Sequence, residues 1–371
     1  AWVMRARPFH FVVAVSVIVL LVCLPPVMPD RVMRASVLNP EATKGELIFS
    51  RVGRSGTVAL FDQQGDTRFM TNGLPEAIVA QRGIEVSPFA ASGAWLSALP
   101  PLLRPDCDSM LIIGLGGGVA AAYVPPSINE IDVFELEPAV VEANRFIRDR
   151  RNRDPLADER LKIILNDGRN GLALTSKKYD AIVSQPSHPW TAGASHLYTR
   201  EFAEMAAKRL KGGGIFLQWM NTAYVNPDLF RSLAATLLDV FPHVRVYEPT
   251  PGNALFVASD QMIRPEATTQ PKLEIDSRNR QHYSKFGLHT PTHLFSLLRI
   301  DEPELRQLAD GWPLITDEYN LLAMRAPRLI VDPDTEGMQR FLKDYSEFHQ
   351  SATKILDDCP TLDVIDYGLR L

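Results

Sequence analysis

The residues best suited to chemistry are four glycines within residues 114–118 (GLGGG) and an acid, Glu135, which follows about twenty positions later. Glycine lets the backbone turn tightly and approach a ligand closely, and an acid at the tip of the next strand can bind a pair of ribose hydroxyls. The spacing therefore predicts a site for an adenosine-containing cofactor, with Gly114, Gly116, Gly118 and Glu135 as its contacts. A tight turn needs glycine in any case, and Glu135 could instead cap a helix or pair with an arginine.

These residues need a sheet that brings successive strand ends to one edge. Short apolar runs typical of buried strands alternate with helical patterns over much of the chain. The strand patterns fall at residues 110–113, 131–134, 162–165, 181–184, 214–218 and 254–258, and the clearest helical patterns at 200–210 and 228–240. This alternation predicts an α/β fold with a doubly wound, mostly parallel sheet, whose ligand lies at the carboxyl ends of the strands.

Four segments are expected along the chain. Residues 31–89 contain short β-rich runs separated by turn signals around Gly65 and Gly73, which predicts a small antiparallel β-domain. Residues 90–260 carry the doubly wound sheet. Residues 261–371 are richer in proline and charge, and we expect a helical and irregular appendage there. Residues 1–30 are the fourth segment, a membrane anchor.

The anchor is predicted from residues 9–27 (FHFVVAVSVIVLLVCLPPV), which are almost continuously apolar and about as long as a short transmembrane helix. A cleaved signal peptide is the alternative, because arginines precede the run, but no small-residue cleavage site follows it. We therefore expect a retained single-pass anchor in membrane lipid. Two arginines on each side balance one another and leave the orientation open: Arg5 and Arg7 before, Arg31 and Arg34 after.

Composition excludes some partners. A formal net charge of −5 over 371 residues gives no electrostatic reason to expect nucleic acid binding. The strongest basic cluster is interleaved with acids and is expected to form a solvated face or a membrane-proximal surface; it consists of Arg145, Arg148, Arg150, Arg151 and Arg153. The three cysteines, Cys23, Cys107 and Cys359, lie far apart, so we expect no disulfide framework, no metal site and a reducing compartment.

The sheet segment resembles the polyamine aminopropyltransferases, the spermidine synthase family, which have a methyltransferase-type fold. The glycine run and Glu135 match the family's glycine-rich loop and ribose-binding acid, and residues 166–168 (NDG) resemble its adenine-contacting pair. The resemblance adds Asp167 and Gly168 to the cofactor contacts and implies S-adenosylmethionine or its decarboxylated form as the cofactor. Asp167 before a glycine is equally typical of a turn. Further matches lie at residues 179–184 (YDAIVS), 196–202 (HLYTREF) and 210–219 (LKGGGIFLQW).

A narrower resemblance is to the membrane-fused branch of this family, bacterial proteins that carry membrane helices ahead of a synthase-like domain. Residues 186–193 (PSHPWTAG) and 313–320 (PLITDEYN), followed by 326–328 (APR), are similar to the signatures of that branch. The resemblance implies a bacterial inner-membrane protein whose main domain lies in the cytoplasm.

The predicted active-site loop departs from the family. The family supplies two aspartates there, one to remove a proton from the attacking amine and one to bind the polyamine cation, whereas this chain has Gln185 and His188. Glutamine neither titrates nor carries charge, and a protonated histidine would repel a diamine. Gly117 replaces a further family acid, and residues 90–97 replace its Tyr-His-Glu segment. We therefore expect no intact catalytic residue, and we expect His188 at a surface or interface.

Two functions remain open on the sequence. The favoured one is a pseudoenzyme that has lost aminopropyl transfer and serves as an accessory or structural subunit of a bacterial membrane complex, such as an energy-transducing one. Its partners would be other membrane-protein subunits. The alternative is a transferase that uses S-adenosylmethionine or its decarboxylated form with an altered acceptor. The groups that remove a proton and recognise an amine are the missing ones, so the sequence favours the first.

Overall fold

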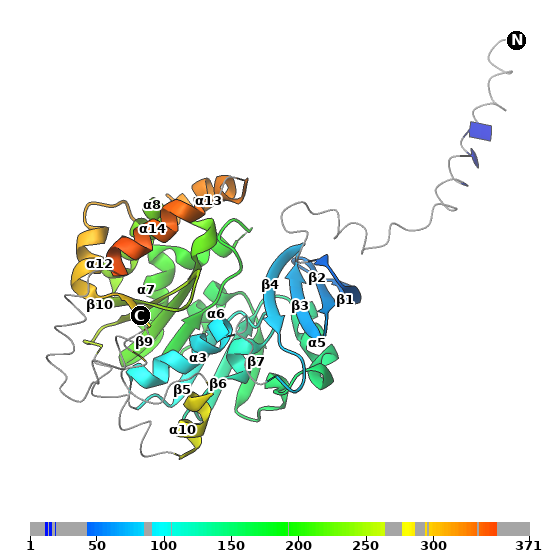
Figure 1. Cartoon of the computed structure of the whole chain (residues 1–371), viewed down its shortest axis with the longest axis horizontal. Coiled ribbons are helices and arrows are strands. Elements are labelled where there is room, and N and C mark those ends of the chain that lie inside the picture. Colours follow the sequence, from blue (N-terminus) through cyan, green and yellow to red (C-terminus); the bar gives the residue numbers. More distant parts are fainter. Residues whose placement is uncertain are drawn as a thin grey trace, which may run out of the picture.

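The computed structural model describes residues 43–84, 91–104, 106–191, 193–263, 277–285, 294, 297–331 and 334–346, and the isolated positions 12, 13, 15, 16 and 19. A small sheet lies beside a larger α/β body whose helices surround a central sheet (Figure 1). Both parts contribute to the candidate site described below.

The larger body is built on an eight-stranded sheet in the order β12-β10-β11-β9-β8-β5-β6-β7. Its strands are β5 (Ser109–Ile113), β6 (Glu130–Glu135), β7 (Leu161–Leu165), β8 (Tyr179–Ser184), β9 (Leu210–Asn221), β10 (His243–Thr250), β11 (Asn253–Ser259) and β12 (Leu298–Ile300). The strands from β7 to β9 run parallel, and β11, β10 and β12 continue the sheet antiparallel. The expected α/β fold is confirmed as a mixed sheet, in which β10 and β12 are additions to the predicted strands.

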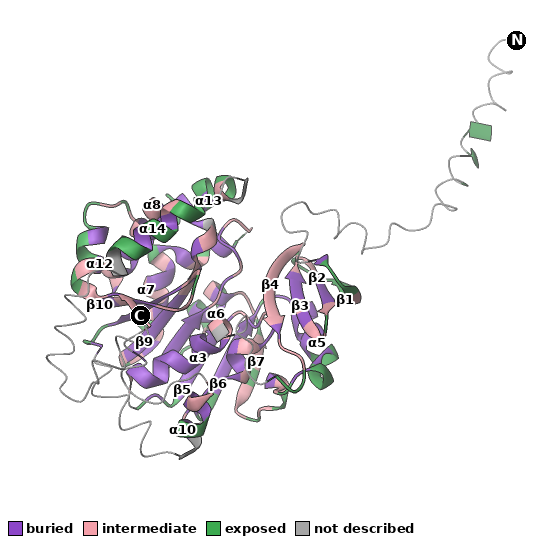
Figure 2. Cartoon of the chain, in the orientation of Figure 1, coloured by how far each residue is buried: buried purple, intermediate pink, exposed green. Residues whose placement is uncertain are grey.

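Helices cover both faces of this sheet because the side chains of its central strands are apolar on both sides. Met110 and Ile112 of β5 lie in one apolar core, and Leu111 and Ile113 lie in the other. Figure 2 shows the buried residues concentrated on the sheet and the inner helix faces.

The helices divide between these two cores. The first core is closed by α3 (Ala91–Leu103), α4 (Val119–Ala122) and α5 (Pro138–Phe146). The second is closed by α6 (Gly168–Leu174), α7 (Arg200–Arg209), α8 (Pro227–Val240), α12 (Glu302–Ala309), α13 (Leu321–Val331) and α14 (Thr335–Ser346). A further helix, α10 (Ser277–Ser284), and the short 3-10 helices η2 (Arg148–Arg150), η3 (Pro155–Ala157), η4 (Ala194–Tyr198) and η5 (Thr222–Tyr224) complete the described elements.

Capping side chains set where the two predicted helices begin. Asn226 accepts a hydrogen bond from the Leu229 amide at 3.0 Å, and Pro227 fits the first turn of α8 because that position needs no amide donor. Thr199 caps α7 in the same way, by accepting a hydrogen bond from the Phe202 amide. Thr199 also follows the last residue of η4, Tyr198. The start of α7 therefore fixes the position of this buried tyrosine, which belongs to the candidate site.

The expected small antiparallel sheet is confirmed, with strands β1 (Glu46–Val52), β2 (Thr57–Gln63), β3 (Asp66–Thr71) and β4 (Leu74–Val79) in sequential order. Asn72 and Gly73 turn β3 into β4 with positive φ angles of 52° and 76°, as a tight hairpin requires. On the larger body, the Glu137 carboxylate accepts hydrogen bonds from the Ser55 amide and hydroxyl at 2.7 and 2.9 Å. These contacts hold the small sheet, and β4 with it, against the sheet edge that carries the site.

The described part of residues 261–371 packs into the larger body. β12 pairs with β10 at the end of the main sheet. Leu305 of α12 and Phe341 of α14 are buried in the second core. Part of the expected appendage is therefore integral to the core of the α/β body.

Among the residues that the structure describes, no helix combines the length and the apolar character that a membrane span needs. The anchor predicted at residues 9–27 lies outside the described residues, apart from five isolated helical positions. The anchor stays a prediction.

Candidate functional site

The loops that the sequence singled out meet at the carboxyl edge of the main sheet. The Gly114 amide donates to the Phe134 carbonyl at 2.9 Å, and the Gln185 amide donates to the Ile113 carbonyl at 3.0 Å. β5 and β8 are neighbours although β6 and β7 lie between them along the chain, so the topological switch point falls between the glycine loop and the loop after β8. Ligands of doubly wound sheets bind at this point.

The glycine loop, residues 114–118, brings its backbone close to the neighbouring strand end. Gly114 has a φ of +93°, and a Cβ there would lie 2.6 Å from the Gln185 carbonyl oxygen, so any side chain would collide. Gly116 also has a positive φ, +51°, but a Cβ there would meet no atom within 4 Å. A Cβ at Gly118 would collide with the Asn144 side chain. Of the three predicted contacts in this loop, Gly116 is the one that borders open space.

Glu135 ends β6 beneath this loop and is only 6% exposed. Its two carboxylate oxygens accept hydrogen bonds from the Leu115 and Glu137 amides, each at 2.8 Å. Burial raises the pKa of Glu135, and the backbone amides oppose that rise. The carboxylate thus holds the glycine loop, and the Gly116 and Leu136 amides also favour its charged form.

Asp167 and Gly168 lie at the start of α6. The Asp167 carboxylate accepts hydrogen bonds from the Arg169 and Asn170 amides at 3.0 Å each, so the residue serves as an N-cap. A Cβ on Gly168 would lie 2.6 Å from the Ile113 side chain, so the glycine lets α6 pack against the end of β5. Both residues therefore have structural roles that account for them.

Arg151 is the exception in the basic cluster, in which Arg145, Arg148 and Arg150 are exposed. It is 6% exposed, and its guanidinium donates to the Gly117 carbonyl at 2.9 Å and to the Asn144 side chain at 3.1 Å. Burial lowers the pKa of Arg151 to about 10, which leaves it charged at neutral pH. The glycine loop is thus held through its amides by Glu135 and through a carbonyl by Arg151.

His188, in the loop after β8, is buried and not at the surface. It is 5% exposed and stacks on Trp190 with ring centroids 4.5 Å apart. Its Nε2 lies 3.0 Å from the Pro75 carbonyl oxygen, which can only accept, so the ring proton is on Nε2. Burial lowers the pKa of His188. The side chain is therefore neutral at physiological pH, and the repulsion of a cationic ligand expected from the sequence does not arise.

Glu76 on β4 is a site residue that the sequence analysis missed. Its Oε1 accepts a hydrogen bond from the Ser187 hydroxyl at 2.6 Å. Burial raises the pKa of Glu76 to about 7, the Ser187 hydrogen bond opposes the rise, and the negative charge of Glu135 adds to it. The only sequence signal was an acid just after the Asn72–Gly73 turn, in a strand that was not predicted.

β4 also lies against the glycine loop. A Cβ on Gly117 would lie 2.9 Å from both the Ala77 and the Val79 side chains. Ala77 and Val79 follow Glu76 within three positions on β4. The small sheet therefore contacts both halves of the site, the glycine loop and the loop after β8.

Several buried oxygens at this place have no hydrogen-bond partner within the described part of the chain. They are the Ser184 hydroxyl, the Gln185 side-chain carbonyl and the Tyr198 hydroxyl. Ser184 and Tyr198 are both at most 2% exposed. Burial and the charge of Glu76 raise the pKa of Tyr198, so its hydroxyl stays protonated. Buried polar groups without partners are uncommon in native proteins and indicate that a ligand or water completes them.

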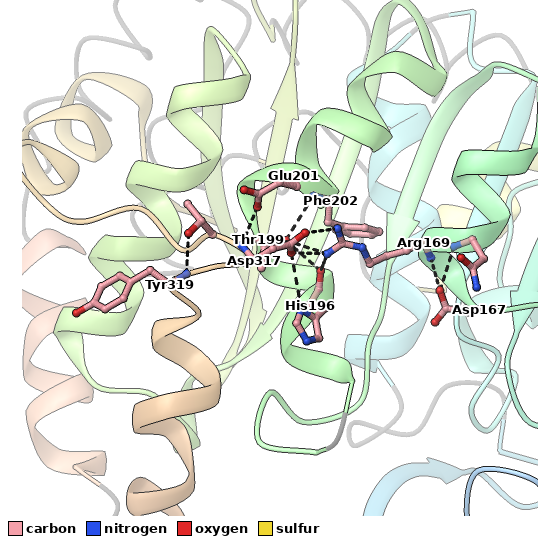
Figure 3. A network of polar contacts seen from close by, with 10 residues as sticks. Asp167, Arg169, His196, Thr199, Glu201, Phe202, Asp317 and Tyr319 are labelled. Carbon is pink, nitrogen blue, oxygen red and sulfur yellow. Dashed lines mark hydrogen bonds and ion pairs between the residues drawn. The ribbon is translucent and has the colours of Figure 1, made fainter.

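A second polar cluster, around Asp317, is fully paired. The Arg169 guanidinium binds both Asp317 carboxylate oxygens at 2.6 Å, and the Thr199 hydroxyl donates to the same carboxylate at 2.9 Å. The Asp317 amide donates to Glu201 at 2.9 Å. Figure 3 shows Arg169 reaching from α6 to the segment that carries Asp317. The signature at residues 313–320 thus ties the C-terminal region to the body of the fold.

Comparison with known proteins agrees with this architecture. Residues 94–251 match the spermine/spermidine synthase domain. The polyamine aminopropyltransferase of Korarchaeum cryptofilum is 27% identical over 213 residues, which are 53% of this chain and 65% of that protein. The enzyme of the same name from Serratia proteamaculans is 29% identical over 155 residues, 41% of this chain and 54% of that protein. The chain thus spans about half to two thirds of the length of these relatives.

Solved structures share the fold. A spermidine synthase in complex with the transition-state analogue AdoDATO aligns with a TM-score of 0.54 and 20% identity, over 71% of this chain and 88% of that one. A probable spermidine synthase from Corynebacterium glutamicum aligns with a TM-score of 0.52 and 19% identity, over 72% of this chain and 96% of that one. Residues 94–251 of this chain thus match a domain of the spermidine synthase family.

Proposed function

We propose that this protein is a transferase of the aminopropyltransferase type that uses S-adenosylmethionine or its decarboxylated form and acts on an altered amine acceptor. The observation that carries the proposal is a set of buried oxygens that have no partner within the described residues: those of Ser184 and Gln185 at the carboxyl end of β8, and that of Tyr198 at the end of η4. A protein that kept the fold only as a scaffold would gain by replacing them with apolar groups.

The residues of the glycine loop fit a nucleoside. Gly116 borders open space, which allows a ligand to approach the backbone closely. Glu135 is buried at the strand end beneath this loop, and backbone amides orient its carboxylate. Both residues would hold the cofactor, and the cofactor would supply an electrophilic carbon next to a sulfonium sulfur. Arg151 and Glu135 fix the loop in advance, which lowers the entropic cost of binding.

The acceptor side differs from that of the family. Gln185 and His188 carry no charge at neutral pH, so the loop after β8 offers hydrogen bonds and no ion pair to an acceptor. The His188–Trp190 stack adds a flat apolar surface beside it. The loop therefore lacks the two carboxylates that the family offers to a polyamine, and this difference is the reason to propose an altered acceptor.

Calorimetry tests the nucleoside site directly. S-adenosylmethionine and its decarboxylated analogue are titrated into the full chain, and we expect micromolar binding of at least one. Gly116→Ala is expected to weaken that binding at least tenfold, because a methyl group would enter the open space. Gly311→Ala is the matched control, since Gly311 also has a positive φ, +72°, and room for a Cβ. No binding at millimolar concentrations of either ligand would refute the proposal.

A second candidate is a non-catalytic accessory or structural subunit of a bacterial inner-membrane complex, held by an anchor at residues 9–27, with its main domain in the cytoplasm. What supports it is that Asp167 and Glu135 are already bound by backbone amides, as in a self-sufficient scaffold. The replacement of both loop aspartates points the same way. Purification in mild detergent tests it: a stable complex with other subunits is expected, and a lone monomer would contradict it.

A further inference from the structure

We infer that Glu76 of β4 supplies the carboxylate that binds the acceptor's ammonium group and takes its proton, a role for which the loop after β8 offers only Gln185 and His188. The inference rests on the proposed transferase function. It assigns the missing acid to the small sheet and not to the loop where the resemblance places it.

The position of Glu76 is the first argument. Its carboxylate is bound to Ser187 at 2.6 Å, and the preceding carbonyl, of Pro75, binds His188 at 3.0 Å. Residues on the same strand pack against Gly117. β4, the strand that carries Glu76, therefore contacts the nucleoside half of the site as well as the acceptor half.

The lack of a counter-ion is the second argument. Within the described residues, no lysine, arginine or histidine forms an ion pair with Glu76, and the charge that acts on it most is that of another acid, Glu135. A half-buried carboxylate beside a second carboxylate is unfavourable in the free protein. A cationic ligand would relieve both costs, so the site is electrostatically suited to an ammonium group.

The titration of Glu76 suits proton transfer. A carboxylate whose pKa is about 7 accepts a proton from an ammonium group more readily than one at the ordinary value of 4.5. In the step, the N–H bond of the ammonium breaks, its electron pair stays on nitrogen as the nucleophilic lone pair, and the proton passes to the Glu76 carboxylate. Ser187 is a positioning residue in this step, because its hydroxyl orients the carboxylate.

The other titratable groups that face Glu76 do not compete for this role. His188 is neutral and its Nε2 proton is held by Pro75. The Tyr198 hydroxyl stays protonated. Glu135 has both oxygens on backbone amides. Glu76 is thus the one acid in this set whose carboxylate is bound by a single side-chain hydroxyl.

The test is calorimetric titration of the full chain with 1,4-diaminobutane at pH 6, 7 and 8. The apparent affinity of the wild type is expected to rise about tenfold from pH 6 to pH 8, as Glu76 changes from mostly protonated to mostly ionised. Glu76→Gln keeps a hydrogen-bond acceptor for Ser187 but removes the charge, and is expected to bind at least tenfold more weakly at pH 8 and with no pH dependence.

Glu142→Gln is the matched control, because Glu142 is an exposed acid paired with Arg51. It should bind the diamine as the wild type does. Equal affinities for the wild type and Glu76→Gln, or no binding of the diamine to the wild type, would overturn the inference.

The cofactor titration separates the two proposals. If the nucleoside binds and Glu76→Gln leaves diamine binding unchanged, the transferase proposal stands and the role of Glu76 is wrong. If no nucleoside binds, the transferase proposal itself fails, whatever the diamine does.

Discussion

Asp317 and Glu76 are two acids in comparable settings with opposite electrostatics. Each accepts a hydrogen bond from a hydroxyl, Asp317 from Thr199 and Glu76 from Ser187. The Arg169 guanidinium lowers the pKa of Asp317, whereas burial raises the pKa of Glu76. The first acid is ionised and paired, and it holds two parts of the chain together.

Glu76, by contrast, is costly to ionise, and no cation pairs with it within the described residues. A group that lowers stability persists where function needs it. The contrast therefore separates a structural polar cluster from a functional one, although the two acids look alike in sequence.

Glu76→Gln should give the largest change in stability. The pKa of Glu76 is raised from 4.5 to about 7, so its contribution to stability is fully present below pH 4.5 and is lost as the pH rises through 7. The neutral variant should be more stable than the wild type at pH 8 by roughly 2 kcal/mol, at about 1.4 kcal/mol per pKa unit with a discount for partial exposure.

Urea unfolding at pH 5 and pH 8 measures this difference. The extra stability of Glu76→Gln over the wild type should shrink greatly at pH 5. Glu142→Gln should show little change in stability at either pH. A Glu76→Gln variant that is less stable than the wild type at pH 8 would remove the contrast between the two acids.

Asp317→Asn should act in the opposite direction. It removes the charge that Arg169 binds at both oxygens, and we expect a loss of about 1–2 kcal/mol in the free energy of unfolding at pH 7. The loss should fade as the pH drops below 3.8, because the stability from an acid with a lowered pKa is lost as the pH falls through its folded-state value. Asp228→Asn is the control, since its partner Arg231 is 3.7 Å away and the Asp228 side chain is 46% exposed.

Ser187→Ala should give the smallest effect and sharpen the comparison. The Ser187 hydrogen bond lowers the pKa of Glu76, so its removal should raise that pKa above about 7. Isotope-edited infrared titration of the glutamate carboxyls would follow the change. The free energy of unfolding should change by about 1 kcal/mol or less. A Glu76 titration midpoint that moves to lower pH would contradict the hydrogen bond from Ser187 to Glu76.

Part of the site was predictable because its signals are local. The glycines at 114–118 and Glu135 are set by strand ends and turn chemistry, and the structure brings them together at the expected edge. β5 and β8 were found because continuous apolar runs are typical of strands buried on both faces. β10 was missed although Val244 and Val246 alternate with more exposed residues, since this antiparallel strand is short of apolar residues.

The remainder of the site depends on contacts between distant parts of the chain. Arg151 looked like one more surface arginine, and its contacts with Gly117 and Asn144 explain its burial. His188 was expected at a surface, and β4 buries it. A short strand such as β4, which begins Leu-Pro-Glu after a turn, carries little local pattern to show that it covers a site.

The sequence by itself determined the α/β fold, the small antiparallel sheet and the glycine loop, because periodicity and turn residues act over a few neighbouring positions. Only the tertiary structure decided the electrostatics of the site. Glu76 and Ser187 are 111 residues apart, and the pKa of a carboxyl depends on what surrounds it in space. Burial against the loop after β8 and proximity to Glu135 make Glu76 an acid that titrates near neutrality.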